Sequence, residues 1–395
     1  MSASAAPALS SLLDRVRAIE PVLRASADEG ETVRRLPDAA FRAMRDQGLY
    51  NILRPQAFGG METDPVTAYQ VFEEVSRIES AAGWCLQLSA GGEMFGAWFS
   101  DEGAQESFGQ PGAALAGSFG PVRKAVPVEG GYRVTGQSTF ISGAHHATCI
   151  IGLAHIYDHD AAPRLLENGA PVALLTVCPL RDVTIVDTWH TLGMRGTGSH
   201  DVLLQDLFVP DRRAAFFGPL QQPGSAYRGP LYRMTLWITV SALSTVPLGI
   251  ARAALDDLLS LAGKAPAYTM KTLRDRSIVQ AALGEGEATL GAARAYLYEA
   301  LREAWKWVLA GNIIDMQRKM KLQMAATHAV VASAKVVDLV HAAAGASGIR
   351  EEQRFERHFR DIHTITQHAF VSAARYESAG QHFLGVPIEW PFYGV

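Results

Sequence analysis

The sequence Ala125-Val126-Pro127-Val128-Glu129-Gly130-Gly131-Tyr132-Arg133-Val134-Thr135 narrows the possible folds more than any other part of the chain. Two short runs rich in β-branched and aromatic residues flank the central Glu-Gly-Gly, a turn signal that is typical of a β-hairpin. Further strand-like runs follow at residues 150–153, 172–177 and 183–186. Because no long helical pattern interrupts this zone, it favours an antiparallel barrel or sandwich over a parallel α/β sheet.

On both sides of the β-rich zone, apolar residues recur at the three- and four-residue steps of amphipathic helices. The N-terminal side is helical from residue 10 to about 108, with a break at Gly59-Gly60. The C-terminal side shows long periodic stretches over about 231–262, 272–310, 315–344 and 352–383, which suit a helical bundle. The sequence therefore predicts an α+β fold with an N-terminal helical domain over 1–112, a central antiparallel β-barrel over 113–215 and a C-terminal four-helix bundle over 216–395.

The composition excludes several classes of protein. The chain has 395 residues, of which 48% are hydrophobic and 19% are charged, too apolar a mixture for a disordered chain. The chain has 36 Lys and Arg residues against 40 Asp and Glu residues, and the basic residues are not clustered in any block. This charge pattern argues against nucleic acid or an anionic membrane as a partner. We expect a soluble cytoplasmic protein with no signal peptide, and no stretch of about 18 uncharged apolar residues that could span a membrane.

Common catalytic and metal-binding motifs are missing from the sequence. We find no GxGxxG after a strand, no Walker loop, no HExxH and no GxSxG. The three cysteines have neither disulfide nor zinc-site spacing. Four histidines gather near one predicted strand, but their polar loop offers no regular ligand geometry, so we predict no metal site; they are His145, His146, His155 and His159.

Several short motifs occur in order along nearly the whole chain. They are Leu36-Pro37, Pro55 with Gly59-Gly60, Phe140-Ile141-Ser142-Gly143, residues 192–199 with Phe208-Val209-Pro210, Pro247-Leu248-Gly249, residues 345–348 and Arg360-Asp361. Together they resemble the acyl-CoA dehydrogenase superfamily. The resemblance implies a flavin bound between a barrel and a four-helix bundle, and a homotetramer or homodimer.

The dehydrogenases of that superfamily use a carboxylate base to remove a proton next to a thioester. The resemblance implies two possible places for that base. One lies nine residues beyond Arg360, where this chain has Ala369 directly after His368. The other lies ten residues before Gly249, where this chain has Thr239. Neither position holds an acid, so the dehydrogenase base is missing.

A histidine at this C-terminal position, with the runs 116–121, 130–136 and 140–143, resembles the two-component flavin-dependent monooxygenase branch. Members of that branch include hydroxyphenylacetate, dibenzothiophene and indole oxygenases. The resemblance implies that a separate NAD(P)H-dependent flavin reductase supplies reduced flavin, FADH2 or FMNH2, by diffusion. The oxygenase then uses O2 to hydroxylate a small aromatic substrate through a flavin C4a-hydroperoxide.

The same resemblance implies the residues of the site. Ser142 contacts the flavin N5, and His368, on an amphipathic helix, faces C4a, where an imidazole that titrates near neutrality can donate or take a proton. Other flavin contacts come from Ser118, Phe140, Trp189 and Thr197, and from Gly345 and Gly348, whose loop allows close approach to a phosphate, including that of a neighbouring subunit. Substrate contacts come from Trp84, Phe95, Trp237 and Leu243.

Each of these residues also has a purely structural explanation, and two other functions stay open. Ser142 can simply end a strand, and His368 can be an ordinary helix residue. The chain could be an acyl-CoA dehydrogenase or oxidase with an atypical base, or a flavin-free scaffold without activity. No basic patch for CoA phosphates and no Arg clamp for a substrate carboxylate are evident. This composition favours a flat apolar substrate, either indole-type or polycyclic.

Overall fold

The computed structural model describes residues 6–110, 112–158, 162–220, 222–266 and 270–395, so that His159 lies outside the described residues. The first helices are α1 (Leu9–Val33), α2 (Asp38–Asp46), α3 (Pro65–Ile78), α4 (Ser80–Gly92) and α5 (Asp101–Phe108). The strands are β1 (Leu115–Val128), β2 (Gly131–Ser138), β3 (Cys149–Ile156), β4 (Ala173–Pro179), β5 (Thr184–Val186), β6 (Asp201–Pro210) and β7 (Ala214–Phe216). The last helices are α6 (Trp237–Ala242), α7 (Thr245–Leu261), α8 (Ser277–Leu309), α9 (Met316–Ala344), α10 (Phe355–Ile365) and α11 (Arg375–Leu384).

The predicted order of helical, β and helical segments is confirmed, but the sheet is mixed rather than antiparallel. Its strand order is β5-β6-β2-β1-β3-β4-β7. The predicted hairpin joins β1 to β2, with Val128 opposite Gly131 and Gly130 in the left-handed region. β1 runs parallel to β3, with Leu115 opposite Cys149. After β2 the chain crosses the end of β1 through a connection that contains no long helix. β3 therefore runs antiparallel to β2 and parallel to β1, which lies between them.

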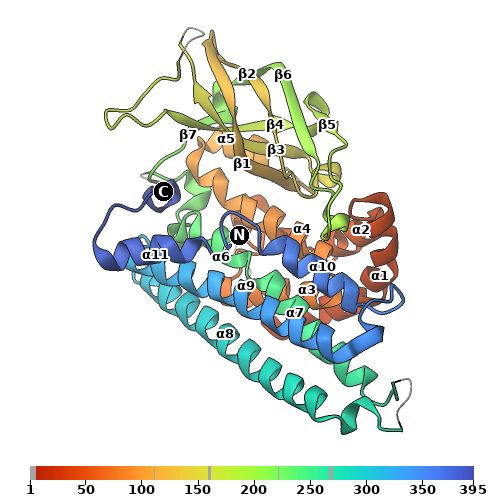
Figure 1. Ribbon diagram of the computed structural model, residues 1–395. Coiled ribbons are helices and arrows are strands. Elements are labelled where there is room, and N and C mark those ends of the chain that lie inside the picture. Colours follow the sequence, from red (N-terminus) through yellow and green to blue (C-terminus); the bar gives the residue numbers. More distant parts are fainter. Residues whose placement is uncertain (1–5, 111, 159–161, 221, 267–269) are drawn as a thin grey trace.

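The helices before and after the sheet pack together into one helical body, with the sheet at one end of it (Figure 1). α3 packs against both α1 and α7, while α9 contacts α6, α7, α8, α10 and α11. The small-residue face of α9 is buried within this one chain; its members are Ala325, Ala326, Ala329, Val330, Ser333, Val336, Val337 and Val340. Whether 1–112, 113–215 and 216–395 are separate domains stays a prediction.

The last predicted helix is wrong in one respect that matters for the site. It is broken into α10 and α11, and residues 366–374 form turns between them. The run Thr364-Ile365-Thr366 is β-branched, and the hydroxyls of Thr364 and Thr366 donate to the carbonyls of Arg360 and His363. Such side chains weaken a helix by restricting rotamers and by offering the backbone other partners. His368 therefore lies in a turn rather than on a helix.

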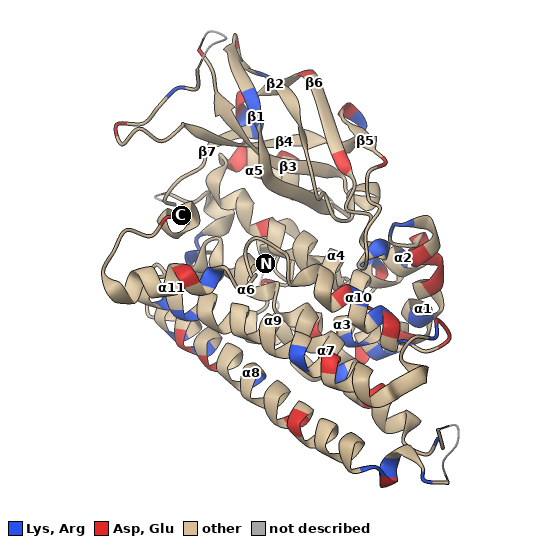
Figure 2. Ribbon diagram, in the orientation of Figure 1, with Lys and Arg blue, Asp and Glu red and all other residues tan. Residues whose placement is uncertain are grey.

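Two segments have the length and composition of membrane-spanning helices, Trp237–Leu261 and Met316–Ser347. The expectation that the sequence contains no such stretch is therefore wrong by this criterion. In the first segment, 94% of the most apolar window is buried inside the protein, and in the second 56% is. The first segment, which contains α6 and α7, thus belongs to the core of the helical body. The long helix α8 carries both acidic and basic residues (Figure 2).

Candidate active site

A cavity of about 810 Å³ lies where the sheet meets the helical body. Its wall combines residues of α4, β1, α6, the loop of residues 189–199 (the 189–199 loop) and residues 363–370. Its volume lies within the range of roughly 300–1,000 Å³ that is typical of ligand sites. The cavity is therefore large enough for a cofactor together with a small ligand.

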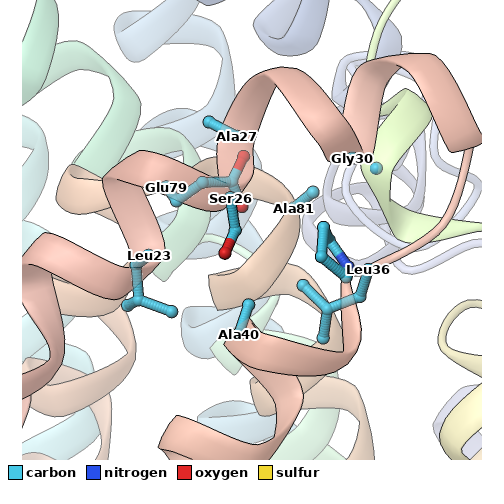
Figure 3. A pocket seen from close by; sticks show the side chains of 10 residues that line it. Leu23, Ser26, Ala27, Gly30, Leu36, Ala40, Glu79 and Ala81 are labelled. Carbon is cyan, nitrogen blue, oxygen red and sulfur yellow. The ribbon is translucent and has the colours of Figure 1, made fainter.

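A second cavity is far smaller. It has a volume of about 10 Å³ and lies among the side chains of α1, α2 and the start of α4, including Leu23, Ser26, Ala40 and Glu79 (Figure 3). A cavity of this size has room for about one water molecule. It is too small to bind a substrate or a cofactor.

Most of the predicted site residues line the large cavity. They are Trp84, Phe95, Ser118, Phe140, Ser142, Trp189, Thr197, Leu243 and His368. Three others lie outside its wall. Trp237 is fully buried and stacks on Tyr393, with ring centroids 4.9 Å apart. Gly345 and Gly348 lie beyond the end of α9, where Lys264 Nζ donates to Ser347 Oγ at 2.8 Å.

Ser142 belongs to a chain of buried hydroxyl groups that also includes Ser199 and Thr197 (the hydroxyl chain). Ser142 Oγ lies 2.7 Å from Ser199 Oγ, which lies 2.6 Å from Thr197 Oγ1. Thr197 Oγ1 donates its proton to the carbonyl of Met194 at 2.8 Å. At the other end, Trp84 Nε1–H donates to Ser142 Oγ at 3.0 Å.

When all of these contacts are hydrogen bonds at the same time, the Met194 carbonyl at one end sets the direction of each bond in the hydroxyl chain. A carbonyl only accepts, so Thr197 donates to Met194 and must accept from Ser199. Ser199 has then used its proton and must accept from Ser142. Ser142 thus donates to Ser199 and accepts from Trp84, which leaves one lone pair on its oxygen. In this arrangement Ser142 offers the cavity a hydrogen-bond acceptor rather than a donor.

Backbone hydrogen bonds hold Ser142 in a tight turn against the 189–199 loop. Ser142 N–H donates to Phe140 O at 3.0 Å, and Gly143 N–H donates to Thr197 O at 2.9 Å. Phe140 has a φ of 61°, an unfavourable conformation for an aromatic residue that persists only where neighbouring contacts hold it. Its side chain is 65% exposed and lies edge-on to Trp189, with centroids 6.0 Å apart. The turn thus presents an aromatic ring and a hydroxyl together at the cavity.

His368 reaches the cavity from the turns between α10 and α11. Its ring lies 5.3 Å from that of Trp84, so this tryptophan contacts both His368 and Ser142. The backbone N–H of Phe370 donates to His368 Nδ1 at 3.4 Å, which leaves the proton of the neutral ring on Nε2. Burial lowers the pKa of His368 to about 4, although part of the ring is reachable from the cavity. The expectation that this imidazole titrates near neutrality is therefore wrong.

The two positions where a dehydrogenase would carry its base both lie at the cavity wall. Thr239 and Ala369 line it, and Thr239 Oγ1 donates to Gly91 O at 2.9 Å. Among the described residues, no Asp, Glu, Lys or Arg lines the cavity. The wall therefore lacks the carboxylate that α-proton abstraction requires.

An aromatic cluster that the sequence analysis missed forms one end of the cavity. Phe119, Phe370, Trp390 and Phe392 all line it, and Phe392 stacks on Phe119 with centroids 5.6 Å apart. The last two belong to residues 386–395 (the 386–395 segment), which has no helical periodicity. Lys319 Nζ on α9 holds this segment by donating to Tyr393 O at 3.0 Å and Val395 O at 2.7 Å. The density of aromatic residues in Trp390-Pro391-Phe392-Tyr393 was the available signal.

Known proteins share both this fold and the extent of the chain. The family description "Acyl-CoA dehydrogenase, N-terminal domain" matches residues 10–107, and "Acyl-CoA dehydrogenase, C-terminal domain" matches residues 241–373. An indole-3-acetate monooxygenase from Pseudomonas putida is 32% identical over 96% of this chain and 94% of its own length. The oxygenase subunit HsaA of a flavin-dependent monooxygenase from Rhodococcus jostii is 26% identical over 95% of this chain and 99% of its own length. The structure of XiaF from Streptomyces sp. with FADH2 and glycerol has a TM-score of 0.87 and 28% identity, and the match covers 97% of each chain.

Proposed function

The chain belongs to the flavin-dependent monooxygenases of the acyl-CoA dehydrogenase family, and on that premise we propose that its large cavity binds reduced flavin beside a small aromatic substrate. When bound, reduced flavin would supply the two electrons that activate O2, so that one oxygen atom is added to the substrate ring and the other leaves as water. The proposed substrate class is indole-type or polycyclic, and the proposed flavin is FADH2 or FMNH2.

The hydroxyl chain carries this proposal, because its free lone pair matches reduced flavin. Reduced flavin bears a hydrogen on N5, whereas oxidised flavin has an acceptor there. Ser142 Oγ donates to Ser199 and accepts from Trp84, so its remaining lone pair fits a donor such as that N–H group. Ser118, Phe140, Trp189 and Thr197 also line the cavity and would hold the flavin with Ser142.

His368 supplies the proton-bearing group on the helical side of the cavity. Its neutral ring keeps a hydrogen on Nε2 because Nδ1 accepts from Phe370 N–H. We assign this residue to hydrogen-bond donation at the oxygen that is transferred. The surrounding side chains are largely apolar, and an apolar wall disfavours water, which limits side reactions of reactive oxygen species.

The aromatic end of the cavity supports a flat, uncharged substrate. Phe119, Phe370, Trp390 and Phe392 offer ring faces and edges, which favour offset-stacked and edge-to-face contacts with another ring. The lining includes no acidic side chain and no lysine or arginine among the described residues. Phenols and indoles without a charged substituent at the ring fit this wall.

We also propose partners and a location for the enzyme. A separate NAD(P)H-dependent flavin reductase supplies the reduced flavin by diffusion, as the designation of a relative as an oxygenase subunit suggests. The assembly is a homotetramer or homodimer, in which Gly345 and Gly348 approach a phosphate of a flavin bound mainly by another subunit. We place the enzyme in the cytoplasm, where the three buried free cysteines, Cys85, Cys149 and Cys178, stay reduced.

One assay decides this function. The purified protein is supplied with a flavin reductase, NADH and O2 and is tested against a panel of phenols and indoles. We expect a hydroxylated product from at least one ring compound and none from a saturated acyl thioester. Ser142→Ala should lose product formation, whereas Ser260→Ala, at an exposed serine of α7, should not. Dehydrogenation of the thioester with no oxygenation of any ring compound would overturn the proposal.

A further inference from the structure

Asp361 lies behind the cavity wall and joins α10 to two other parts of the fold. Its side chain is 2% exposed and does not line the cavity. Its Oδ1 accepts from Met194 N–H at 2.5 Å, and its Oδ2 accepts from Ser80 O–H at 2.5 Å. Both carboxylate oxygens are thus committed to holding the 189–199 loop and the start of α4 against α10.

Met194 is the point at which this anchor meets the hydroxyl chain. Its carbonyl accepts from Thr197 Oγ1–H at 2.8 Å and from Trp189 Nε1–H at 3.0 Å. Met194 has a φ of 56°, a left-handed conformation that a residue with a side chain keeps only where its surroundings hold it. The Asp361 carboxylate is the group that grips its N–H.

The 189–199 loop also packs closely against α10 at Gly193, the residue before Met194. A Cβ atom on Gly193 would lie 2.3 Å from the backbone carbonyl of Arg360, so only glycine fits there. Arg360 Nη1–H donates to Leu192 O at 3.0 Å. Arg360 and Asp361 thus contact three successive residues of the loop, Leu192, Gly193 and Met194. These contacts restrict the movement of Met194 O.

We propose that Asp361 is a positioning residue, which fixes Met194 O and thereby sets the direction of the hydroxyl chain that ends at Ser142. The inference rests on the proposed flavin site. If Met194 O moves away, the Thr197 hydroxyl loses its acceptor and can turn toward Ser199. Ser199 and Ser142 can then reverse their roles, and Ser142 can offer a donor to the cavity. The site would lose its preference for reduced over oxidised flavin.

The chemistry of the anchor predicts that asparagine can replace the aspartate. The Asn Oδ1 would accept from Met194 N–H, and its amide N–H would donate to Ser80 Oγ. The surroundings also favour an uncharged side chain, since burial and the nearby carboxylates of Glu31 and Glu79 raise the pKa of Asp361 to about 7. Asp361→Ala removes both acceptors and is the disruptive variant.

A control on the same helix separates positioning from general stability. His358, also on α10, bonds to Asp257 of α7, with Nε2 and Oδ2 2.8 Å apart. Asp257→Ala therefore weakens the attachment of α10 without touching the 189–199 loop. Ser80→Ala removes one partner of Asp361 and serves as a milder variant, should Asp361→Ala fail to fold.

The test combines two measurements on each variant. An anaerobic titration gives the affinities for reduced and for oxidised flavin, and hydrogen exchange reports the mobility of the 189–199 loop. We expect Asp361→Ala to reduce the ratio of the two affinities by about tenfold, the scale of one hydrogen bond reversed from acceptor to donor. Asp361→Asn and Asp257→Ala should keep the wild-type ratio. Exchange in the loop should rise in Asp361→Ala, and to a smaller extent in Ser80→Ala, but not in Asp257→Ala.

An unchanged affinity ratio in folded Asp361→Ala overturns the inference. Where only Ser80→Ala folds, loop exchange that does not rise above the wild-type level overturns it. So does loop exchange equal to that of Asp257→Ala. If the wild-type protein binds neither form of flavin, the proposed function fails, while the exchange measurement still decides whether Asp361 holds the loop.

Discussion

Ser142 follows a strand of the sheet and His368 lies between two helices of the helical body, yet both contact the same side chain, Trp84. Trp84 donates to Ser142 Oγ and lies edge-on to the His368 ring. The sequence placed both residues in the site only through resemblance, since a Ser before a glycine and a His in a helical pattern are ordinary features. Ser199, the link that gives Ser142 its acceptor role, lies within the motif of residues 192–199, but the sequence does not indicate its function because hydrogen-bond direction is a property of three-dimensional contacts.

The His368 side chain gives the first prediction at this scale. Replacing it with alanine removes the Nε2–H donor from the cavity, so His368→Ala should lose hydroxylation while NADH oxidation continues and hydrogen peroxide accumulates. Product and peroxide are measured in the same coupled assay. His382→Ala, on α11 outside the cavity lining, is the control. Full coupling in His368→Ala would remove this residue from the mechanism.

The pH dependence of stability gives a second prediction. The pKa of His368 falls from its ordinary value of 6.5 to about 4 in the folded protein. Between these two pH values His368 is protonated in the unfolded chain but neutral in the folded protein. The contribution of His368 to the unfolding free energy is therefore complete above pH 6.5 and is lost as the pH falls toward 4. The difference in unfolding free energy between wild type and His368→Gln should therefore shift against the wild type on acidification. A difference that is constant over this range would contradict the assigned pKa.

At the scale of elements, local patterns predicted most helices but neither the parallel strand pair nor the broken last helix. β1 and β3 have the same residue pattern whichever way they run, and their pairing depends on a ten-residue step across the end of β1 between Ser138 and Cys149. The break after Ile365 is stabilised from outside, since Gln323 of α9 donates to Phe370 O at 2.8 Å. Contacts between distant segments decide the strand pairing, and they act together with the local run Thr364-Ile365-Thr366 to break the helix.

A buried ion pair anchors the segment that follows α4 and precedes the sheet. Arg54 Nη2 lies 2.5 Å from Glu93 Oε1 and also donates to Ala113 O at 2.6 Å. Both side chains are almost fully buried, so Glu93→Ala leaves an unpaired buried cation. We expect a loss of about 3–5 kcal/mol in unfolding free energy, measured by urea denaturation. Asp14→Ala, which breaks an exposed pair with Arg17, should leave stability unchanged. Equal effects of the two substitutions would contradict this account.

The 386–395 segment gives a prediction about substrate size. Phe392 packs on Phe370, with centroids 4.7 Å apart, and closes the aromatic end of the cavity. Phe392→Ala should enlarge that end, so kcat/KM should rise for polycyclic rings relative to single-ring phenols. Phe383→Ala, at an exposed ring of α11, is the matched control. An unchanged ratio of the two kcat/KM values in Phe392→Ala would show that this ring does not limit substrate size.

At the scale of the whole molecule, the site exists because two helical segments distant in sequence form one body beneath a sheet (Figure 1). The cavity wall needs α4 from the first segment, β1 from the sheet, and α6 with residues 363–370 from the last. The periodicity of apolar residues predicts the individual elements, but it does not predict how these elements pack around one cavity. Thr239 and Ala369, the two positions at which the resemblance would put a dehydrogenase base, both line the cavity.

A single turnover with isotopically labelled O2 tests the central claim most directly. The protein is loaded anaerobically with chemically reduced flavin and an aromatic substrate from the reactive panel, then mixed with labelled O2 in the absence of any reductase. We expect the wild type to form a product that carries one labelled oxygen atom, and Ser142→Ala and His368→Ala to lose this product. A hydroxylated product without the label, or turnover of all reduced flavin to peroxide with every ring compound, would contradict it.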